Sequence, residues 1–119
     1  MPTLNEGIRE IGTLAYLKGW GRDPSTKIYY GMIEFAEAGD LWKHREDENW
    51  LKEKGIDSDK VIDKIAEELI DVILYAMDCF NCIGFLDADS MFDYKMRKNA
   101  LRNRIYADDQ ASILEEASE

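Results

Sequence analysis

The sequence predicts an all-α protein, specifically a four-helix bundle with short connections. Apolar residues recur at intervals of three and four along most of the chain, as expected for helices with one buried face. No strand-like alternation of apolar and polar residues lasts more than a few positions. Pro and Gly, with 2 and 8 residues, cluster between the periodic segments. Helices joined by short loops in this way pack as a bundle.

The first helix has a clear start. Thr3 and Glu6 have the spacing of a capping box, in which each side chain accepts a hydrogen bond from the other residue's backbone N–H. We expect the helix to carry an apolar stripe from Leu4 to Ala15 and to end at the Gly-Trp-Gly of residues 19–21.

The second helix is expected to begin after Asp23 and Pro24. Ser25 or Thr26 can cap it, and its apolar face runs to Leu41.

A charged segment and a long helix follow. Residues 43–57 are expected to hold one short helical turn around Trp50. Asp57 or Ser58 is predicted to cap a helix that reaches Gly84, about 40 Å at 1.5 Å per residue. Its apolar stripe is longer than the other helices can cover, which predicts a homodimer or homotetramer.

The fourth helix is predicted to begin after Asp87 or Asp89. Its apolar positions are Met91, Met96, Leu101 and Ile105. Residues 1–106 are therefore predicted to form one helical domain. Residues 107–119 hold five acids and no base, and we expect an acidic C-terminal tail.

The charge balance restricts the possible partners. The chain has 25 Asp and Glu against 15 Lys and Arg, a formal net charge of −10. Such a surface repels nucleic acid, which argues against a general nucleic-acid binder. No apolar run approaches the roughly 20 residues of a membrane span, and the N-terminus does not resemble a secretion signal. These features predict a cytoplasmic protein that does not bind membranes.

Cys79 and Cys82 form a C-x-x-C pair, which in isolation suggests a redox or zinc site. The pair lies within a long apolar helix pattern, with no second cysteine pair and with His44 as the only histidine. We therefore interpret the two cysteines as inert, buried thiols.

Two carboxylate pairs are the most informative feature. Glu34 and Glu37 are three residues apart in the second helix, and Glu68 and Asp71 have the same spacing in the long helix. Residues so spaced lie on one helix face, and both pairs adjoin apolar stripes. Carboxylates that face one another inside a bundle repel and are costly to desolvate, and a bound cation removes both penalties. Oxygen-only ligands favour Mg²⁺, with Mn²⁺ as a substitute.

A basic run follows the acids. Lys95, Asn99 and Arg102 recur at helical spacing, and lysine and arginine complement phosphate oxygens. A solvated helix end is the alternative explanation for this run when it is considered alone.

Three segments together resemble the MazG-type all-α nucleoside triphosphate pyrophosphohydrolases. The segments are Ile-Glu-Phe-Ala-Glu (33–37), Glu-Glu-Leu-Ile-Asp-Val (67–72) and Lys-Met-Arg-Lys-Asn-Ala-Leu-Arg (95–102). The resemblance implies a helical dimer or tetramer that binds magnesium. It also implies hydrolysis of a (deoxy)nucleoside triphosphate to the monophosphate and pyrophosphate, which removes unwanted nucleotides from the pool.

The resemblance also implies roles for individual residues. The metal ligands would be Glu34, Glu37, Glu68 and Asp71. The substrate contacts would be Tyr75 at the sugar or base, and Lys95, Asn99 and Arg102 at the phosphates. Glu37 or Glu67 would accept a proton from the attacking water. For Trp20 and Trp42 we favour core packing over stacking on a base.

Two other functions remain open at this stage. One is a non-catalytic nucleotide-binding or acidic interaction protein, which would bind a triphosphate without releasing pyrophosphate. The other is a carboxylate-bridged di-iron protein, which the absence of a Glu-x-x-His motif disfavours.

Overall fold

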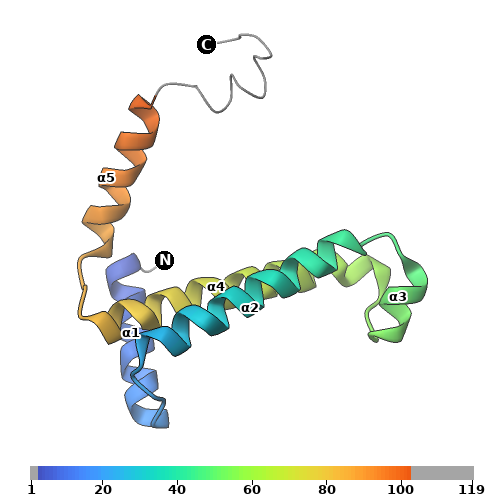
Figure 1. The fold of residues 1–119 in the computed structure, drawn as a ribbon, viewed down its shortest axis with the longest axis horizontal. Helices are drawn as coiled ribbons and strands as arrows, with labels where there is room; N and C mark the ends of the chain where they lie inside the picture. The colour runs from blue at the N-terminus through green and yellow to red at the C-terminus, as the bar shows by residue number, and fades with distance from the viewer. Residues whose placement is uncertain (1–2, 103–119) are drawn as a thin grey trace. The chain divides into compact units, whose positions relative to one another are not determined.

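The computed structural model describes residues 3–102, and every regular element in that range is helical (Figure 1). The all-α prediction is confirmed. The elements are α1 (Leu4–Lys18), α2 (Pro24–Lys43), α3 (Glu48–Glu53), the 3₁₀ turn η1 (Ser58–Lys60), α4 (Val61–Ile83) and α5 (Ala88–Leu101). Within residues 3–102 there are thus five α-helices rather than four, because the expected turn near Trp50 is a helix of six residues. No single helix in this range is long and apolar enough to cross a membrane.

The chain divides into two compact units after Ala88. The first unit contains α1 to α4, and the second begins at Asp89 and includes most of α5. The predicted acidic tail, 107–119, lies outside the described residues.

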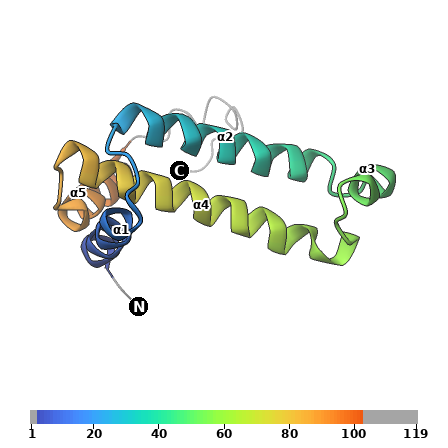
Figure 2. The same ribbon diagram turned by 90° about the horizontal axis from the view of Figure 1, so that it is seen from below.

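The first unit is built on an antiparallel pair of helices, α2 and α4, which lie side by side over most of their length (Figures 1 and 2). At one end α1 crosses α4. At the other end, α3 and η1 connect the pair around a small core of Leu41, Leu51 and Val61. The predicted site residues on α2 and α4 are therefore held by two packed helices rather than by loops.

The helix starts agree with the sequence at α1 and differ at α2 and α4. Thr3 and Glu6 form the predicted capping box. The N-cap of α2 is Asp23, not Ser25 or Thr26, because Pro24 lacks an N–H and suits the first helical position. The Asp23 carboxylate accepts hydrogen bonds from the Ser25 N–H and hydroxyl, which lower its pKa.

In contrast to α1 and α2, α4 has no side-chain cap. The turn η1 precedes this helix, and neither Asp57 nor Ser58 provides the predicted cap. The helix has 23 residues, so it is about 35 Å long rather than 40 Å.

Two glycines provide a test of the α1–α4 contact. A Cβ at Gly12 would lie 2.9 Å from Asn81 Nδ2, and this amide donates a 2.6 Å hydrogen bond to the Ile8 carbonyl. A Cβ at Gly39 in α2 would meet no atom within 4 Å. We expect Gly39→Ala to stabilise the protein by about 1 kcal/mol through helix propensity. Gly12→Ala should instead destabilise it by about 1–2 kcal/mol, because the new methyl displaces Asn81. Urea unfolding measures both changes, and equal stabilisation by the two variants would contradict this packing.

Candidate metal and ligand site

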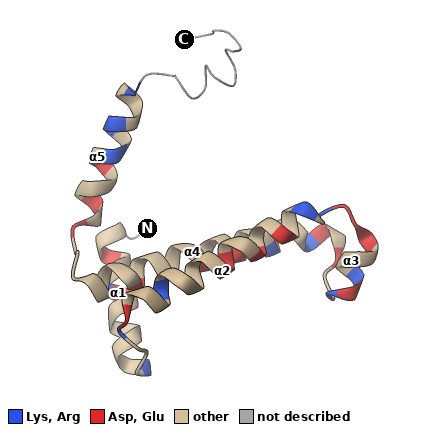
Figure 3. Ribbon diagram, viewed as in Figure 1, with Lys and Arg blue, Asp and Glu red and all other residues tan. Residues whose placement is uncertain are grey.

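Three acidic side chains meet between α2 and α4. Glu34, Glu37 and Glu68 each offer a carboxylate oxygen, and these three oxygens lie within 4.8 Å of one another. Figure 3 shows the acidic positions on both helices where they run side by side. Three of the four predicted metal ligands therefore come together from segments about thirty residues apart in the sequence.

Glu68 is the most constrained member of this acidic cluster. Its Oε1 atom is buried and has no hydrogen-bond partner among the described residues. The pKa of Glu68 is raised, first because its protonated form can donate a hydrogen bond to the Glu34 carboxylate, then by burial and by the negative charge of Glu34, while Lys64 opposes the shift. A buried, unpartnered carboxylate oxygen is costly, and a cation in the cluster would satisfy it. The donor set is oxygen only and fits Mg²⁺ or Mn²⁺.

Asp71, the fourth predicted ligand, lies outside this cluster. It is exposed and lines a neighbouring pocket. Three residues along a helix turn the side chain by about 300°, so Asp71 points roughly 60° away from Glu68 around the α4 axis. Its charge still contributes to the raised pKa of Glu68. The structure therefore brings together three of the four predicted ligands, and the role of Asp71 as a fourth ligand stays a prediction.

The two predicted proton acceptors are placed differently. Both are exposed, but Glu37 is part of the acidic cluster, whereas the Glu67 carboxylate lies 3.4 Å from Lys64 Nζ. Adjacent residues on a helix are turned by about 100°, so Glu67 and Glu68 cannot share one face. This arrangement favours Glu37 over Glu67 as the acceptor.

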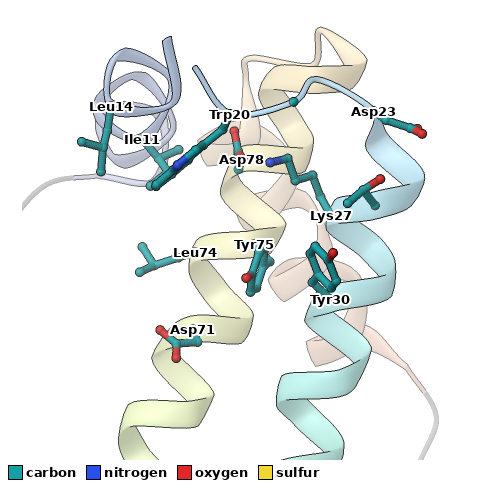
Figure 4. A pocket seen from close by; sticks show the side chains of 12 residues that line it. Ile11, Leu14, Trp20, Asp23, Lys27, Tyr30, Asp71, Leu74, Tyr75 and Asp78 are labelled. Atoms are coloured by element: carbon teal, nitrogen blue, oxygen red, sulfur yellow. Dashed lines mark ion pairs between the residues drawn. The ribbon is translucent and has the colours of Figure 1, made fainter. Parts of the chain in front are cut away.

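A pocket of about 510 Å³ lies next to the cluster, between α1, the start of α2 and α4 (Figure 4). Its walls are mostly apolar, with Ile11, Leu14, Trp20 and Leu74 among them. Asp71 and Tyr75 line the pocket, and the charges of Glu34 and Asp71 reach the Tyr75 hydroxyl.

Tyr75 stands between the cluster and the pocket. Its ring lies 5.8 Å from that of Tyr30, which comes from the facing helix. Burial, followed by the charges of Glu34 and Asp71, raises its pKa, so the hydroxyl stays protonated at neutral pH and can donate a hydrogen bond. Tyr75 thus lines the pocket beside the acidic cluster, and its contact with a sugar or base stays a prediction.

The tryptophan prediction is wrong for both residues. Trp20 is 42% exposed and lines the pocket, and Trp42 is exposed with the Arg45 guanidinium 3.6 Å from its ring centre. Trp20 lies in the connection between α1 and α2, which leaves α1 through Gly19 at φ 70°. From that connection its ring reaches the pocket between α1, α2 and α4 and stays partly exposed there.

A buried ionic group, not predicted from the sequence, lies at the end of the pocket. Asp78 Oδ2 accepts from Lys27 Nζ at 2.8 Å, and its Oδ1 accepts from Arg22 at 3.0 Å. A usable signal was present, because the sequence has no Lys or Arg between Lys64 and Lys95. An acid on the apolar stripe of that segment must find its partner on another helix or loop.

The predicted phosphate contacts belong to the second unit of the chain. Lys95 and Asn99 lie on α5 and Arg102 follows it, all in the second unit, so their role at the phosphates stays a prediction. Cys79 and Cys82 are free and partly buried, and burial is the main cause of the raised pKa of Cys79. A raised pKa keeps this thiol protonated, in line with the inert role predicted for it.

Comparison with known proteins yields no relative. No family model matches the chain, and no curated protein or solved structure is significantly similar to it.

The raised pKa of Glu68 predicts a pH-dependent stability. Below pH 4.5, the ordinary pKa of a glutamate, Glu68 is protonated in both the folded and the unfolded state. As the pH rises, the folded state keeps this proton to a higher pH than the unfolded state does. The stabilisation this group provides is therefore lost as pH rises from about 4.5 through the raised value. In EDTA, wild type should lose stability relative to Glu68→Gln over that range. Urea unfolding at several pH values measures the difference, and a pH-independent difference would contradict the environment described for Glu68.

Proposed function

We propose that the protein is a metal-dependent nucleoside triphosphate pyrophosphohydrolase, and that Glu34, Glu37 and Glu68 hold its Mg²⁺ or Mn²⁺. The observation that carries the proposal is the buried Glu68 Oε1, which has no partner among the described residues and lies beside two further carboxylates. Glu37 is exposed and Glu34 and Glu68 are half-buried, so the need for a cation rests on this one shielded oxygen, which is costly to leave without a partner. The resemblance of segments 33–37, 67–72 and 95–102 to MazG-type enzymes supplies the reaction class.

The neighbouring pocket supports a nucleoside as the organic part of the substrate. Its volume of about 510 Å³ falls in the range of small-molecule sites, about 300–1,000 Å³. Trp20 offers an exposed ring for a base, and Tyr75 offers a hydroxyl for the sugar. Because Tyr75 is close to the acidic cluster, a triphosphate attached to the bound nucleoside would extend toward the carboxylates.

Each residue of the proposed site has a separate role in the reaction. When bound, the cation supplies charge neutralisation at the phosphates and acidifies water. The water oxygen would attack the α-phosphorus while Glu37 accepts a proton from this water. The bond between the α-phosphorus and the oxygen that bridges to the β-phosphate would then break, and pyrophosphate would leave. Asp71, outside the cluster, would contact the cation or the sugar from the pocket side. Lys95, Asn99 and Arg102 are the proposed phosphate contacts.

A product-resolved assay tests this proposal. Canonical ribonucleoside and deoxyribonucleoside triphosphates are incubated with the full chain and Mg²⁺, and the products are separated by ion exchange. We expect monophosphate and pyrophosphate from at least one substrate, with no reaction in EDTA. Diphosphate and orthophosphate, or binding without turnover across the whole panel, would contradict the proposed reaction.

We also propose that two copies of the chain associate through the α2–α4 pair. A groove of about 360 Å³ between these helices is lined almost wholly by apolar side chains, among them Met32, Phe35, Phe80 and Ile83. Met32 is 63% exposed, although it belongs to the apolar face of α2. A second copy offers the same face by symmetry, and two such pairs would make a four-helix arrangement.

Charge substitution in this groove tests the association. Met32→Asp and Ile83→Asp should shift the chain from dimer to monomer in sedimentation velocity, because each places a charge in a dry interface. Tyr16→Asp, at an exposed position on α1, is the control and should not change the assembly. A monomeric wild type at micromolar concentration would contradict the association.

A further inference from the structure

We propose that Asp78 is a positioning residue that seats Trp20 against the pocket through Arg22 and Lys27. The inference rests on the proposed function only for the identity of the ligand, a nucleoside base that stacks on Trp20. The placement of Trp20 itself follows from the contacts described below.

The first step is the burial of the ionic group. The side chain of Asp78 is 4% exposed and that of Lys27 is 9% exposed, within a pocket wall that is otherwise mostly apolar (Figure 4). The free-energy cost of desolvating such a pair offsets most of the attraction between its two charges. Replacing a buried ion pair by apolar residues therefore often leaves the stability of the fold unchanged or raises it. Fold stability alone therefore gives a weak reason for this arrangement.

The Asp78 carboxylate connects α4 to the α1–α2 connection and to the start of α2. Its two oxygens bind cations from different parts of one short segment: Arg22 in the α1–α2 connection and Lys27 in the first turns of α2. Trp20 lies two residues before Arg22, and the Lys27 ammonium is 5.9 Å from the centre of the Trp20 ring. Asp78 thus links the segment that carries Trp20 to α4, and the Lys27 ammonium lies over the Trp20 ring at cation–π distance.

The third step is the conformational freedom that this tie removes. Gly19 and Gly21 flank Trp20, and a Cβ at either position would meet no atom within 4 Å. Such a connection loses considerable entropy when it is ordered on ligand binding. The Trp20 N–H donates to the Ala15 carbonyl at 2.9 Å, which holds the start of the connection. The Arg22–Asp78 ion pair holds the residues that follow, so the aromatic wall of the pocket exists before the ligand arrives.

Fluorine NMR of 5-fluorotryptophan-labelled protein tests this inference. The three tryptophan resonances are assigned with Trp20→Phe and Trp42→Phe. Because Asp78→Asn removes a buried charge and can impair folding, the main variant is Arg22→Gln, whose parent side chain is 46% exposed. Arg22→Lys restores the charge, and Lys18→Gln removes a nearby exposed charge as a control. In the absence of ligand we expect only the Trp20 resonance to move toward that of a solvated ring in Arg22→Gln, and to return in Arg22→Lys.

Titration with the four uncharged deoxynucleosides supplies the second readout, because a neutral probe does not respond to the lost charge itself. We expect the dissociation constant read at Trp20 to rise about tenfold in Arg22→Gln and to stay unchanged in Lys18→Gln. A Trp20 resonance that is identical in wild type, Arg22→Gln and Asp78→Asn would overturn the inference. If Arg22→Gln moves the resonance but no nucleoside affects it in wild type, the positioning role stands and the nucleoside pocket of the proposed function fails.

Discussion

Glu68→Gln is expected to reduce magnesium-dependent pyrophosphate release by more than about a hundredfold while the metal-free protein stays folded. Removing an outer-shell partner of a metal ligand lowers metal affinity or activity about 10–100-fold. Removing the ligand itself, here one with a buried oxygen, should lower activity further. Without metal, the substitution removes a charge that Glu34 repels. We therefore expect the free energy of unfolding at neutral pH to hold or to rise, even though activity is lost.

A matched variant separates a metal ligand from a general charge effect. Glu10→Gln removes an exposed acid on α1, far along the sequence from the cluster. It should retain near-normal turnover and the same midpoint for magnesium. If Glu68→Gln turned over normally, Glu68 would not be a ligand; if it were unfolded, the carboxylate would be structural.

Asp78→Asn is expected to have the largest effect on stability, a loss of about 3–5 kcal/mol, because it leaves the buried Lys27 ammonium without its counter-charge. The double variant Lys27→Met/Asp78→Leu removes both charges and should recover most of that loss. Urea unfolding of the two single variants and the double variant gives the coupling between the residues. A double variant as unstable as Asp78→Asn would contradict the ion pair as the cause.

Local signals in the sequence predicted the helices well. The apolar periodicity, the Thr3–Glu6 capping box and the glycine ends at Gly19 and Gly84 act within a few residues, and the structure has each of them. The cap of α2 was misplaced because the proline signal and the serine signal compete within three residues, and the proline sets the first helical position.

The site could be predicted only in part. Spacing within one helix identified Glu34 with Glu37 and Glu68 with Asp71, but it does not fix how far each helix is rotated toward its neighbour. That rotation brings Glu68 into the cluster and turns Asp71 toward the pocket. The absence of Lys and Arg between Lys64 and Lys95 indicates that the partner of Asp78 lies elsewhere in the chain. It does not indicate which residue is the partner, because the contacts join residues more than fifty positions apart.

Manganese binding tests the central claim most directly, because it does not depend on knowing the substrate. Mn²⁺ is titrated into the full chain, and the free ion is measured by its electron paramagnetic resonance signal. Wild type and Glu10→Gln should each bind at least about one Mn²⁺ ion per chain, and the signal of free Mn²⁺ should fall accordingly. Glu34→Gln and Glu68→Gln should lose that site, and added Mg²⁺ should displace Mn²⁺ from wild type. Equal Mn²⁺ binding by all four proteins, or none by wild type, would contradict a metal site in the acidic cluster.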